Sequence, residues 1–427
     1  MAVFALVDAN NFYASCEKLF NPSLKNRPVV VLSNNDGCVV ARSAEVKALG
    51  IPMGTPWFKL RDDARRHGIV AYSSNYALYA DLSNRVVEIL SGFTPSLEVY
   101  SIDESFLDLS GLAQEGYSAY GAKIRERVAD WVGLAVCVGI GSTKTLAKLA
   151  NHCAKKALAG SNGVCDLSAM PEAQLTSLFS RIEVDEVWGV GRKLSERLAT
   201  MGIRTVQQLR EADAETIRSR FSVVLERTVR ELRGVSCLDL EEIVPTKQQI
   251  MSSRSFGTLV YDLADLEEAV ATYIGRAAEK LRGQNSLAGA VQVYIRTNIF
   301  KPEAPQYQRT VTVPLPETTA DTRILTHWAL RVLRRIYRPG FGYHKAGITL
   351  LDIRPRANQQ FSLLVPDGVA GVRNEKVMSV LDSINQRYGR GTLRLAAEGV
   401  EQGWRMRRGN LSPRYTTEWT ELPSVRA

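Results

Sequence analysis

The sequence has no long hydrophobic run. Its longest apolar stretch, Val132–Ile140, is far shorter than the roughly 20 residues that a transmembrane helix needs. The apolar residues before Asp8 are also too few for the hydrophobic part of a signal peptide. We therefore expect a cytoplasmic protein that has no membrane partner.

Cysteine is scarce, and no two cysteines have the CxxC spacing that is typical of zinc and redox sites. The six cysteines are Cys16, Cys38, Cys137, Cys153, Cys165 and Cys237. Such scattered residues are interpreted as reduced thiols. The sequence therefore favours neither a disulfide framework nor a zinc centre.

The length of the chain indicates how many domains it can form, and its net charge indicates what kind of partner it favours. With 427 residues, the chain has room for about three domains of ordinary size. It has 54 Lys and Arg against 45 Asp and Glu, which gives a net charge of +9 and a pI near 9.2. This excess favours a polyanionic partner, with a modestly basic soluble protein as the alternative.

Two adjacent carboxylates, Asp103 and Glu104, interrupt the stretch Val99–Leu109, which otherwise alternates like a buried strand. Neighbouring side chains on a regular strand point to opposite faces. Both acids can therefore serve one site only if the backbone turns there, with Ile102 and Phe106 as its anchors. A surface hairpin with solvated acids is the commoner origin of such a pair.

A second acidic position favours a site over a surface hairpin. Asp8 directly follows the apolar run Val3–Val7. Two short hydrophobic strands that each meet a charge predict carboxylates that converge at the edge of one sheet.

Strand and helix patterns alternate through the first 170 residues. We expect strands at 3–7, 28–32 and 134–140, a short apolar segment at 38–42, helices at 11–19, 43–49, 78–90 and near 118–131, and a mixed, irregular segment at 54–75. Because the acidic hairpin implies antiparallel pairing, this region is predicted to be α+β with a mixed or antiparallel sheet.

The helix expected after residues 134–140 carries Lys144, Lys148 and Lys155. At 100° per residue these lysines lie within about 40° of one another. A basic helix face is usually exposed to solvent. Because this face lies directly behind a candidate acidic site, contact with a phosphate group is a strong alternative interpretation. The preceding glycines do not form a phosphate-binding loop, because Thr143 stands where that motif needs glycine.

Residues 171–240 are predicted to be all helical. Within them, residues 187–192 resemble a helix–hairpin–helix element, in which Gly189 and Gly191 let backbone N–H groups beside Arg192 approach a DNA phosphate. A plain helix–loop–helix is an equally good interpretation.

A second pattern follows an acidic linker at 239–245. We expect a strand at 248–256, a helix at 265–281, strands at 288–297 and 309–315, a helix at 323–337 and a strand at 345–351. This βαββαβ order predicts a ferredoxin-like domain with one sheet covered by two helices.

This second domain carries much of the excess positive charge. Between Thr322 and Arg356 there are eight Lys or Arg and one acid, Asp352. Arg254, Arg296 and Arg309 lie on the expected strands, which suggests that the open sheet face also contacts DNA. Backbone contacts to duplex DNA of this kind would be strongly salt-dependent.

The tail from Pro355 is less regular. The apolar peptide 360–364 is bounded by polar residues, and its composition fits a docking segment and an ordinary strand equally well. Residues 378–388 are expected to form a short helix.

Several of these segments resemble the Y-family translesion DNA polymerases. They are Asp8 with Asn11-Phe12-Tyr13, SNNDGCVVAR (33–42), YSIDESF (100–106), KTLAKLANHCAKK (144–156) and the hairpin at 188–192. Matches at 73–86, 230–234, 389–393 and 411–417 are typical of one bacterial branch of the family. The resemblance spans nearly the whole chain.

The resemblance implies an α+β multidomain fold with the domains of a right-handed polymerase. The expected order is palm (1–17 and 78–170), fingers (18–77), helical thumb (171–240), linker (241–246), little finger (247–355) and a C-terminal tail (356–427).

The resemblance also assigns roles to single residues. Asp8, Asp103 and Glu104 would be catalytic and would hold two Mg²⁺ ions, with the backbone carbonyl of Ala9 as a further ligand. Tyr13 matches the steric gate that excludes ribonucleotides. The other matches are Lys47 and Lys155 for the nucleotide triphosphate, Val39 and Val40 above the nascent base pair, and Gln360, Phe361, Ser362, Leu363 and Leu364 for a sliding-clamp peptide.

The function implied is error-prone DNA synthesis past damaged template bases, in SOS mutagenesis and DNA repair. The substrates would be primer–template DNA and dNTPs, and the partners a UmuD′ dimer, RecA and the sliding clamp, at the nucleoid. Two other classes are an inactive DNA-binding scaffold and a palm-type nucleotidyl cyclase. The intact acidic set argues against the scaffold, and a cyclase would need neither the hairpin nor the basic βαββαβ domain.

Overall fold

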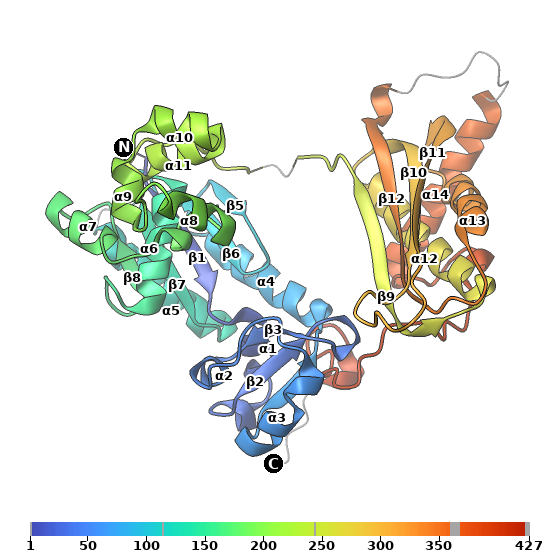
Figure 1. Cartoon of the computed structure of the whole chain (residues 1–427), viewed down its shortest axis with the longest axis horizontal. Helices are drawn as coiled ribbons and strands as arrows, with labels where there is room; N and C mark the ends of the chain where they lie inside the picture. Colours follow the sequence, from blue (N-terminus) through green and yellow to red (C-terminus); the bar gives the residue numbers. More distant parts are fainter. Residues whose placement is uncertain (1, 113–114, 243–244, 359–367, 423–427) are drawn as a thin grey trace. The chain divides into compact units, whose positions relative to one another are not determined.

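The computed structural model describes residues 2–112, 115–242, 245–358 and 368–422. The chain forms two compact units (Figure 1). The first comprises residues 1–33, 37–244 and 410–427, and the second comprises residues 34–36 and 245–409.

A five-stranded sheet is the centre of the first unit. Its strands are β1 (Phe4–Ala9), β5 (Leu97–Val99), β6 (Glu104–Asp108), β7 (Val136–Gly141) and β8 (Val164–Asp166), in the order β5-β6-β1-β7-β8. Strand β1 is antiparallel to both β6 and β7, whereas β8 is parallel to β7. The predicted mixed sheet and the predicted acidic hairpin (β5–β6) are both confirmed.

Helices cover both faces of this sheet. The helices α4 (Tyr76–Ser91) and α5 (Tyr117–Val132) share a core with Ala5 and Val7 of β1. On the other face, Ala147 of α6 (Lys144–Lys156) packs on Phe4 and Leu6. The alternation of β1 thus separates its odd and even residues between two cores.

Helix α6 lies very close to β7 because Gly139 has no side chain. A Cβ atom at Gly139 would come within 2.0 Å of the Asn151 backbone nitrogen and 2.3 Å of the Ala147 carbonyl oxygen. This close approach brings the amphipathic α6, which begins after the capping hydroxyl of Thr143, onto the sheet.

The fingers form a smaller sheet with its own core. Its strands are β2 (Val29–Leu32), β3 (Val39–Arg42) and β4 (Val70–Ser73), in the order β3-β2-β4. Helix α1 (Phe12–Leu19) precedes β2, and α2 (Ala44–Ala48) and α3 (Arg61–His67) connect β3 to β4. The expectation that residues 54–75 are irregular is wrong, since they contain α3 and β4. Helix α3 buries only Ala64, so its sequence lacks a clear apolar period.

The thumb is helical, as predicted. It contains α7 (Glu172–Phe179), α8 (Arg192–Ala199), α9 (Val206–Glu211), α10 (Ala214–Arg220) and α11 (Val223–Leu232). Its core continues into α6 through Leu146, Leu149 and Cys153.

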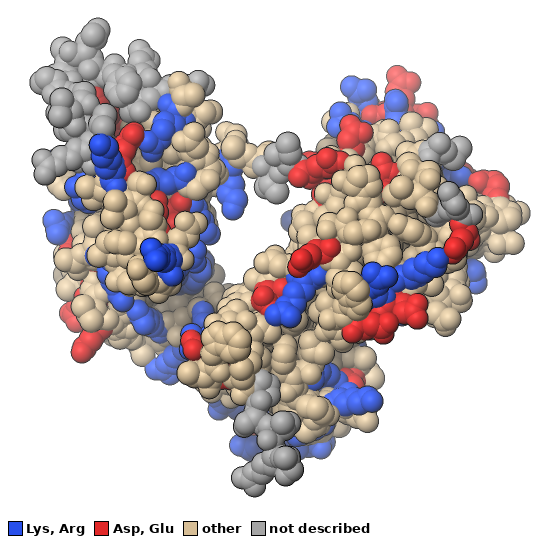
Figure 2. Space-filling model, turned by 180° about the vertical axis from the view of Figure 1, so that it is seen from behind, with Lys and Arg blue, Asp and Glu red and all other residues tan. Residues whose placement is uncertain are grey.

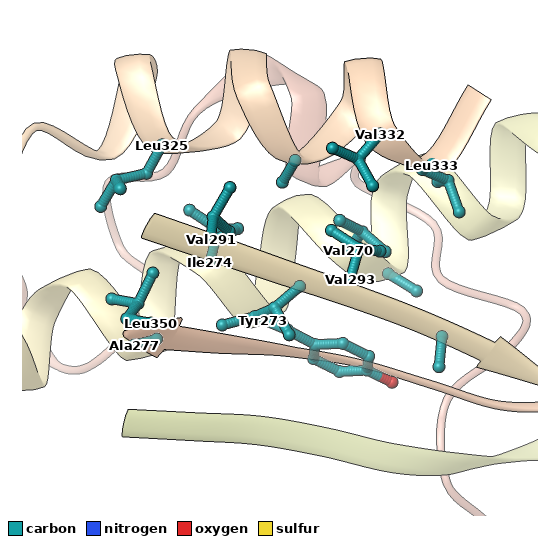
Figure 3. Packing of buried hydrophobic residues seen from close by; sticks show 14 of the residues in the cluster. Val270, Tyr273, Ile274, Ala277, Val291, Val293, Leu325, Val332, Leu333 and Leu350 are labelled. Atoms are coloured by element: carbon teal, nitrogen blue, oxygen red, sulfur yellow. The ribbon is translucent and has the colours of Figure 1, made fainter. Parts of the chain in front are cut away.

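The second unit has the predicted βαββαβ order. Its strands are β9 (Ile250–Val260), β10 (Ser286–Arg296), β11 (Gln308–Thr319) and β12 (Tyr343–Pro355), and its helices are α12 (Leu263–Gly283), α13 (Thr322–Ile336) and α14 (Gly368–Tyr388). The sheet order β11-β10-β12-β9 interleaves the two β–α–β units, and every neighbouring pair is antiparallel. Figure 3 shows the core that α12 and α13 form with the sheet, with Val270 and Ile274 against Val291 and Val293.

The chain after α14 contains short turns of helix at Ala396–Glu398 and Trp419–Glu421. Helix α14 confirms the helix expected at 378–388. The predicted clamp peptide 360–364 lies outside the described residues. Within the described ranges, no helix is both long and apolar enough to cross a bilayer.

Candidate active site

The palm sheet brings the predicted carboxylates together. Asp8 of β1 pairs directly with Glu104 of β6, and the Ala9 N–H donates to the Asp103 carbonyl (2.9 Å). Asp8 follows Phe4 and Leu6 on the sheet face that α6 covers, and Glu104 shares this face with Phe106. The predicted convergence of Asp8 with Asp103 and Glu104 is therefore confirmed.

Asp103 lies in the turn that precedes β6, where the period of the strand no longer applies. The Ser101 hydroxyl donates to Asp103 Oδ1 (2.6 Å), and Ser101 Oγ accepts from the backbone N–H groups of Asp103 (3.3 Å) and Glu104 (3.1 Å). Ser101 thus fixes the turn that separates the two acids. It was not predicted, although a serine two residues before an acid is a typical turn former.

Two lysines of α6 form ion pairs with the carboxylates and balance their negative charge. Lys148 Nζ donates to both oxygens of Glu104 (2.9 and 3.0 Å), and Lys155 Nζ donates to Asp8 Oδ2. The ammonium of Lys148 also lies 4.6 Å from the ring centre of Tyr100 and 5.5 Å from that of Trp188. The prediction that the lysine face of this helix lies behind the acidic site is confirmed for these two residues.

Burial and like charge both act on Asp8, whose residue exposure is only 7%. Burial raises its pKa to about 6 with a smaller contribution from the charges of Glu104 and Asp103, even though Lys155 acts to lower it. Because neighbouring carboxylates raise one another's pKa, all three acids stay ionised together only when positive charge lies nearby. As they stand, no three His, Cys, Asp or Glu side chains in the described parts of the chain form a group that could hold a metal ion.

The structure corrects the DNA-binding role predicted for Lys144. This residue is 4% exposed, and its ammonium donates to Glu98 Oε2 (2.6 Å) and to the Asp239 carbonyl (3.3 Å). The same Glu98 oxygen accepts from the Glu241 N–H (2.8 Å). Lys144 therefore attaches the segment after the thumb to the palm, and it is too buried to reach DNA.

We expect Lys144→Ala to lower the free energy of unfolding by about 3–5 kcal/mol, because it leaves the Glu98 carboxylate buried without its partner. Lys156→Ala, at the exposed end of the same helix, should change it by less than about 0.5 kcal/mol. Urea unfolding of both variants measures the difference. Equal values would mean that the buried ion pair does not stabilise the fold.

Tyr13, the predicted gate, is the second residue of α1, the helix that follows Asp8. Asn11 caps this helix with a left-handed backbone (φ 51°), which turns the chain so that Tyr13 lies half-buried near the acids. Its ring stacks on Tyr79 (centroids 4.5 Å, planes 17° apart) and meets the edge of Tyr76 (6.1 Å). Burial, together with Tyr76 and Asp103, raises the pKa of Tyr13.

A basic group lies beside Asp8 in the fingers. Lys47 of α2 has a lowered pKa because of burial, Arg42 and Lys155, while Asp8 acts in the opposite direction. Arg42, which also donates to the Ile51 carbonyl (2.5 Å), was not predicted. The sequence signals for it are that it ends the motif at 33–42 and that it lies shortly before Lys47.

The two predicted valines do not share a face. Val39 is fully buried in the core of the fingers with Val30 and Leu32, so its predicted contact with a base pair is wrong. Val40, next along β3, is half-buried on the opposite face. The strand alternation makes contact possible for Val40 alone.

The thumb hairpin has the expected open glycines. Gly189 has φ +86°, and a Cβ atom at Gly189 or Gly191 would meet no atom within 4 Å. Gly191 precedes the exposed first turn of α8, where Arg192 contacts Glu196 (3.4 Å). Trp188 packs on Tyr100 and Phe106 (5.5 and 5.9 Å between ring centres), so the hairpin is tied to the acidic turn of the palm.

The strand register places the three arginines that were predicted on the open sheet face on two different faces. Arg296 pairs with Lys345, and both lie on the face away from α12 and α13. Arg254 pairs with Ala346, and Arg309 pairs with Ile295. Because Ala346 and Ile295 are buried under the helices, the open-face prediction is wrong for Arg254 and Arg309. Figure 2 shows further Lys and Arg side chains dispersed over the visible surface of the chain.

Three family models match the chain. Residues 7–152 match a model described as the impB/mucB/samB family, residues 247–363 match its C-terminal domain, and residues 375–425 match a domain of unknown function. UmuC of Salmonella typhimurium is 47% identical over 425 residues, which are 99% of this chain and 100% of that protein. ImpB of Salmonella typhimurium is 46% identical over 426 residues, again 99% and 100%.

More distant relatives and solved structures of similar fold are also DNA polymerases. DNA polymerase IV of Desulfatibacillum aliphaticivorans is 28% identical over 92% of this chain and 95% of its own. A Y-family DNA polymerase chimera has a TM-score of 0.63 at 20% identity, and DinB from Sulfolobus solfataricus has 0.52 at 19%. Each covers 83% of this chain and 99% of its own.

The four kinds of domain and the palm carboxylates define a Y-family DNA polymerase, the class of enzyme that performs translesion DNA synthesis. The predicted resemblance is thereby confirmed. Within this class, the chain belongs to the impB/mucB/samB family.

Proposed function

We propose that the chain extends primers past damaged template bases by two-metal nucleotidyl transfer at Asp8, Asp103 and Glu104. The observation that carries this proposal is the direct pairing of Asp8 with Glu104, with Asp103 in the adjoining turn. Distant parts of the sequence contribute these acids to one end of one sheet, where a primer end and a nucleotide could both reach them.

The donor set fits Mg²⁺, which prefers oxygen ligands and keeps some places for water and substrate phosphates. The carboxylates would hold two ions together with the Ala9 carbonyl. When bound, such ions lower the pKa of the primer hydroxyl and stabilise the charge that develops on the α-phosphate. The pairing of Lys148 and Lys155 with two of the acids supports this assignment, because the site already attracts cations.

The cations beside the acids suit a triphosphate. Lys47 interacts electrostatically with Asp8, with Lys155 and with the unpredicted Arg42. On nucleotide binding, their charges would orient the phosphates toward the carboxylates. Tyr13 would close the sugar side of this pocket, and Val40 would contact the nascent base pair.

DNA would be held by backbone contacts. The exposed hairpin at Gly189 and Gly191, with Arg192, presents backbone N–H groups at the start of α8, which suits a phosphate. In the second unit, the paired Arg296 and Lys345 suit a second stretch of backbone. Neither surface is built to read base sequence, and this suits an enzyme that must accept many templates.

We expect Arg296→Ala and Lys345→Ala each to lower the slope of log affinity against log salt by about 1. Arg254→Ala, on the helix-covered face of the same sheet, is the matched control and should leave the slope unchanged. Fluorescence anisotropy with a labelled primer–template over a salt series measures it. An equal decrease of this slope in all three variants would contradict the proposal that DNA binds the open face of the sheet.

The resemblance extends the proposal to partners. A UmuD′ dimer, RecA and the sliding clamp would direct the polymerase to damaged DNA at the nucleoid. The peptide 360–364 is the proposed clamp contact. Pull-down with the clamp, compared with a chain in which Gln360, Leu363 and Leu364 are replaced by alanine, tests this contact.

Primer extension with Mg²⁺ on undamaged and abasic templates tests the proposed reaction, by the chain alone and with UmuD′ and RecA. We expect extension past the abasic position that stops when EDTA removes the metal. DNA binding without extension under any of these conditions would favour the scaffold. Conversion of a free nucleotide to a cyclic product without a template would favour a cyclase.

A further inference from the structure

The C-terminal segment returns to the first unit. Residues 410–427 belong to that unit, although the chain before them belongs to the second. Asn410 exchanges two hydrogen bonds with Ser73 at the end of β4 (Ser73 N–H to the Asn410 carbonyl, 2.9 Å; Asn410 N–H to Ser73 Oγ, 3.0 Å). In Figure 1 this segment, coloured red, lies against the blue fingers. The tail is thus added to the edge of the fingers sheet.

Ser412, two residues further, is 3% exposed and enters a buried polar network. Asn75 Nδ2 donates to Ser412 Oγ (3.0 Å) and to the Pro413 carbonyl (3.2 Å). The Ser412 hydroxyl donates to Glu17 Oε1 (3.1 Å). The tail therefore contributes one hydroxyl to a carboxylate of α1.

The same carboxylate orients the aromatic residue behind the gate. The Tyr79 hydroxyl donates to Glu17 Oε1 (2.6 Å), and the ring of Tyr79 stacks on Tyr13 (4.5 Å). A continuous chain of contacts thus runs from Ser412 through Glu17 and Tyr79 to Tyr13.

A second contact of the tail lies at the end of α1. The ring of Tyr415 stacks on Phe20 (4.7 Å, planes 12° apart), directly after the last residue of the helix. Ser412 and Tyr415 thus both contact the C-terminal end of α1, the helix that carries the gate in its first turn, at Glu17 and at Phe20. Both residues lie in the region matched by the domain of unknown function.

We propose that the C-terminal segment Asn410–Tyr415 positions the sugar gate, and that discrimination against ribonucleotides depends on its docking. This inference rests on the proposed role of Tyr13 as the gate. Ser412 is a positioning residue in this account, because it acts on Tyr13 through Glu17 and Tyr79.

The chemistry of the network favours orientation over stability alone. Glu17 is 1% exposed, its Oε2 atom has no hydrogen-bond partner among the described residues, and burial raises its pKa to about 7. Burying a carboxylate costs more than burying an apolar side chain of similar size. The carboxylate instead fixes the orientation of its neighbours, because Glu17 Oε1 accepts hydrogen bonds from the hydroxyls of both Tyr79 and Ser412.

Kinetics of single-nucleotide insertion test the proposal. For Ser412→Ala and Tyr79→Phe we expect kcat/KM for a ribonucleotide to rise about three- to tenfold, the size of one hydrogen bond, and the value for the dNTP to stay within about twofold. Thr417→Ala removes a hydroxyl from the exposed side of the same tail and should match the parent. Thermal melting of each variant reports its folding separately.

Double variants separate this proposal from the proposed function. Tyr13→Ala alone reports the gate, and Ser412→Ala added to Tyr13→Ala should have no further effect on sugar choice. If Tyr13→Ala opens the gate while Ser412→Ala and Tyr79→Phe discriminate like the parent, the positioning role is overturned and the gate stands. If Tyr13→Ala leaves sugar choice unchanged, the gate assignment fails, and the positioning role fails with it.

Discussion

Replacing Asp103 by alanine is expected to reduce primer extension by about 10³-fold or more, which corresponds to roughly 4 kcal/mol of lost transition-state stabilisation. Asp103 lies in a fixed turn beside the paired Asp8 and Glu104, and no other acid of that turn could take its place. Because the Asp103 side chain, among the residues that the structure describes, accepts its hydrogen bond from Ser101 of its own turn, its loss should leave the fold intact. Single-turnover extension of a labelled primer with saturating Mg²⁺ and dNTP measures the effect.

Asp130→Ala is the matched control, since Asp130 is an exposed aspartate on α5 of the same palm. It should extend primers at the parental rate. DNA affinity, measured by anisotropy, should be equal for both variants within a factor of about two. Extension by Asp103→Ala at the parental rate would remove the carboxylate from the catalytic site.

Replacing Tyr13 by alanine is expected to raise ribonucleotide incorporation about 10²-fold or more, because the ring that would occupy the space of a 2′-hydroxyl is lost. Since Tyr13 also stacks on Tyr79, a moderate loss of dNTP insertion should accompany the change. The ratio of kcat/KM for matched dNTP and NTP measures the discrimination.

Tyr13→Phe keeps the ring and removes only the hydroxyl, so it should discriminate almost as the parent does. This variant separates the bulk of the ring from its polar group. A gate would be ruled out by an alanine variant that discriminates between the sugars as strongly as the phenylalanine variant.

Most of the fold could be predicted because its elements have strong periodic patterns. The unbroken apolar run before Asp8 predicted β1, which is buried on both faces, and the apolar stripe of α4 indicates the buried face of that helix. The βαββαβ order of the second unit was predicted strand by strand. Residues 54–75 were misjudged because α3 has charged residues on most of its surface and buries only Ala64. A helix of this kind is stabilised by its neighbours and not by its own pattern.

The site was predictable where a motif fixes residues close together, as for Asp103 and Glu104. It was less predictable where the outcome depends on register or on burial. Lys144 shares a helix face with Lys148 and Lys155, yet Glu98 lies close enough to bury its charge. Arg254 and Arg309 could be placed on a face only once the strands were aligned, because a shift of one residue exchanges the two faces.

The residues that were missed act at long range. Ser412 is 395 residues from Glu17, and no local pattern links a tail serine to a gate. Arg42 and Tyr79 each lie in segments whose motifs were noted, but their roles depend on packing between α1, α2 and α4. Contacts of this kind become visible only in three dimensions.

The lysines that hold Asp8 and Glu104 have a consequence for the order of ligand entry. In the proposed mechanism, metal ions would compete with the ammonium groups of Lys148 and Lys155 for the same carboxylate oxygens. An incoming triphosphate would attract these ammonium groups and free the oxygens, so each ligand would strengthen the binding of the other. Thermodynamic reciprocity then requires that the divalent ion tighten nucleotide binding by the same factor as the nucleotide tightens ion binding.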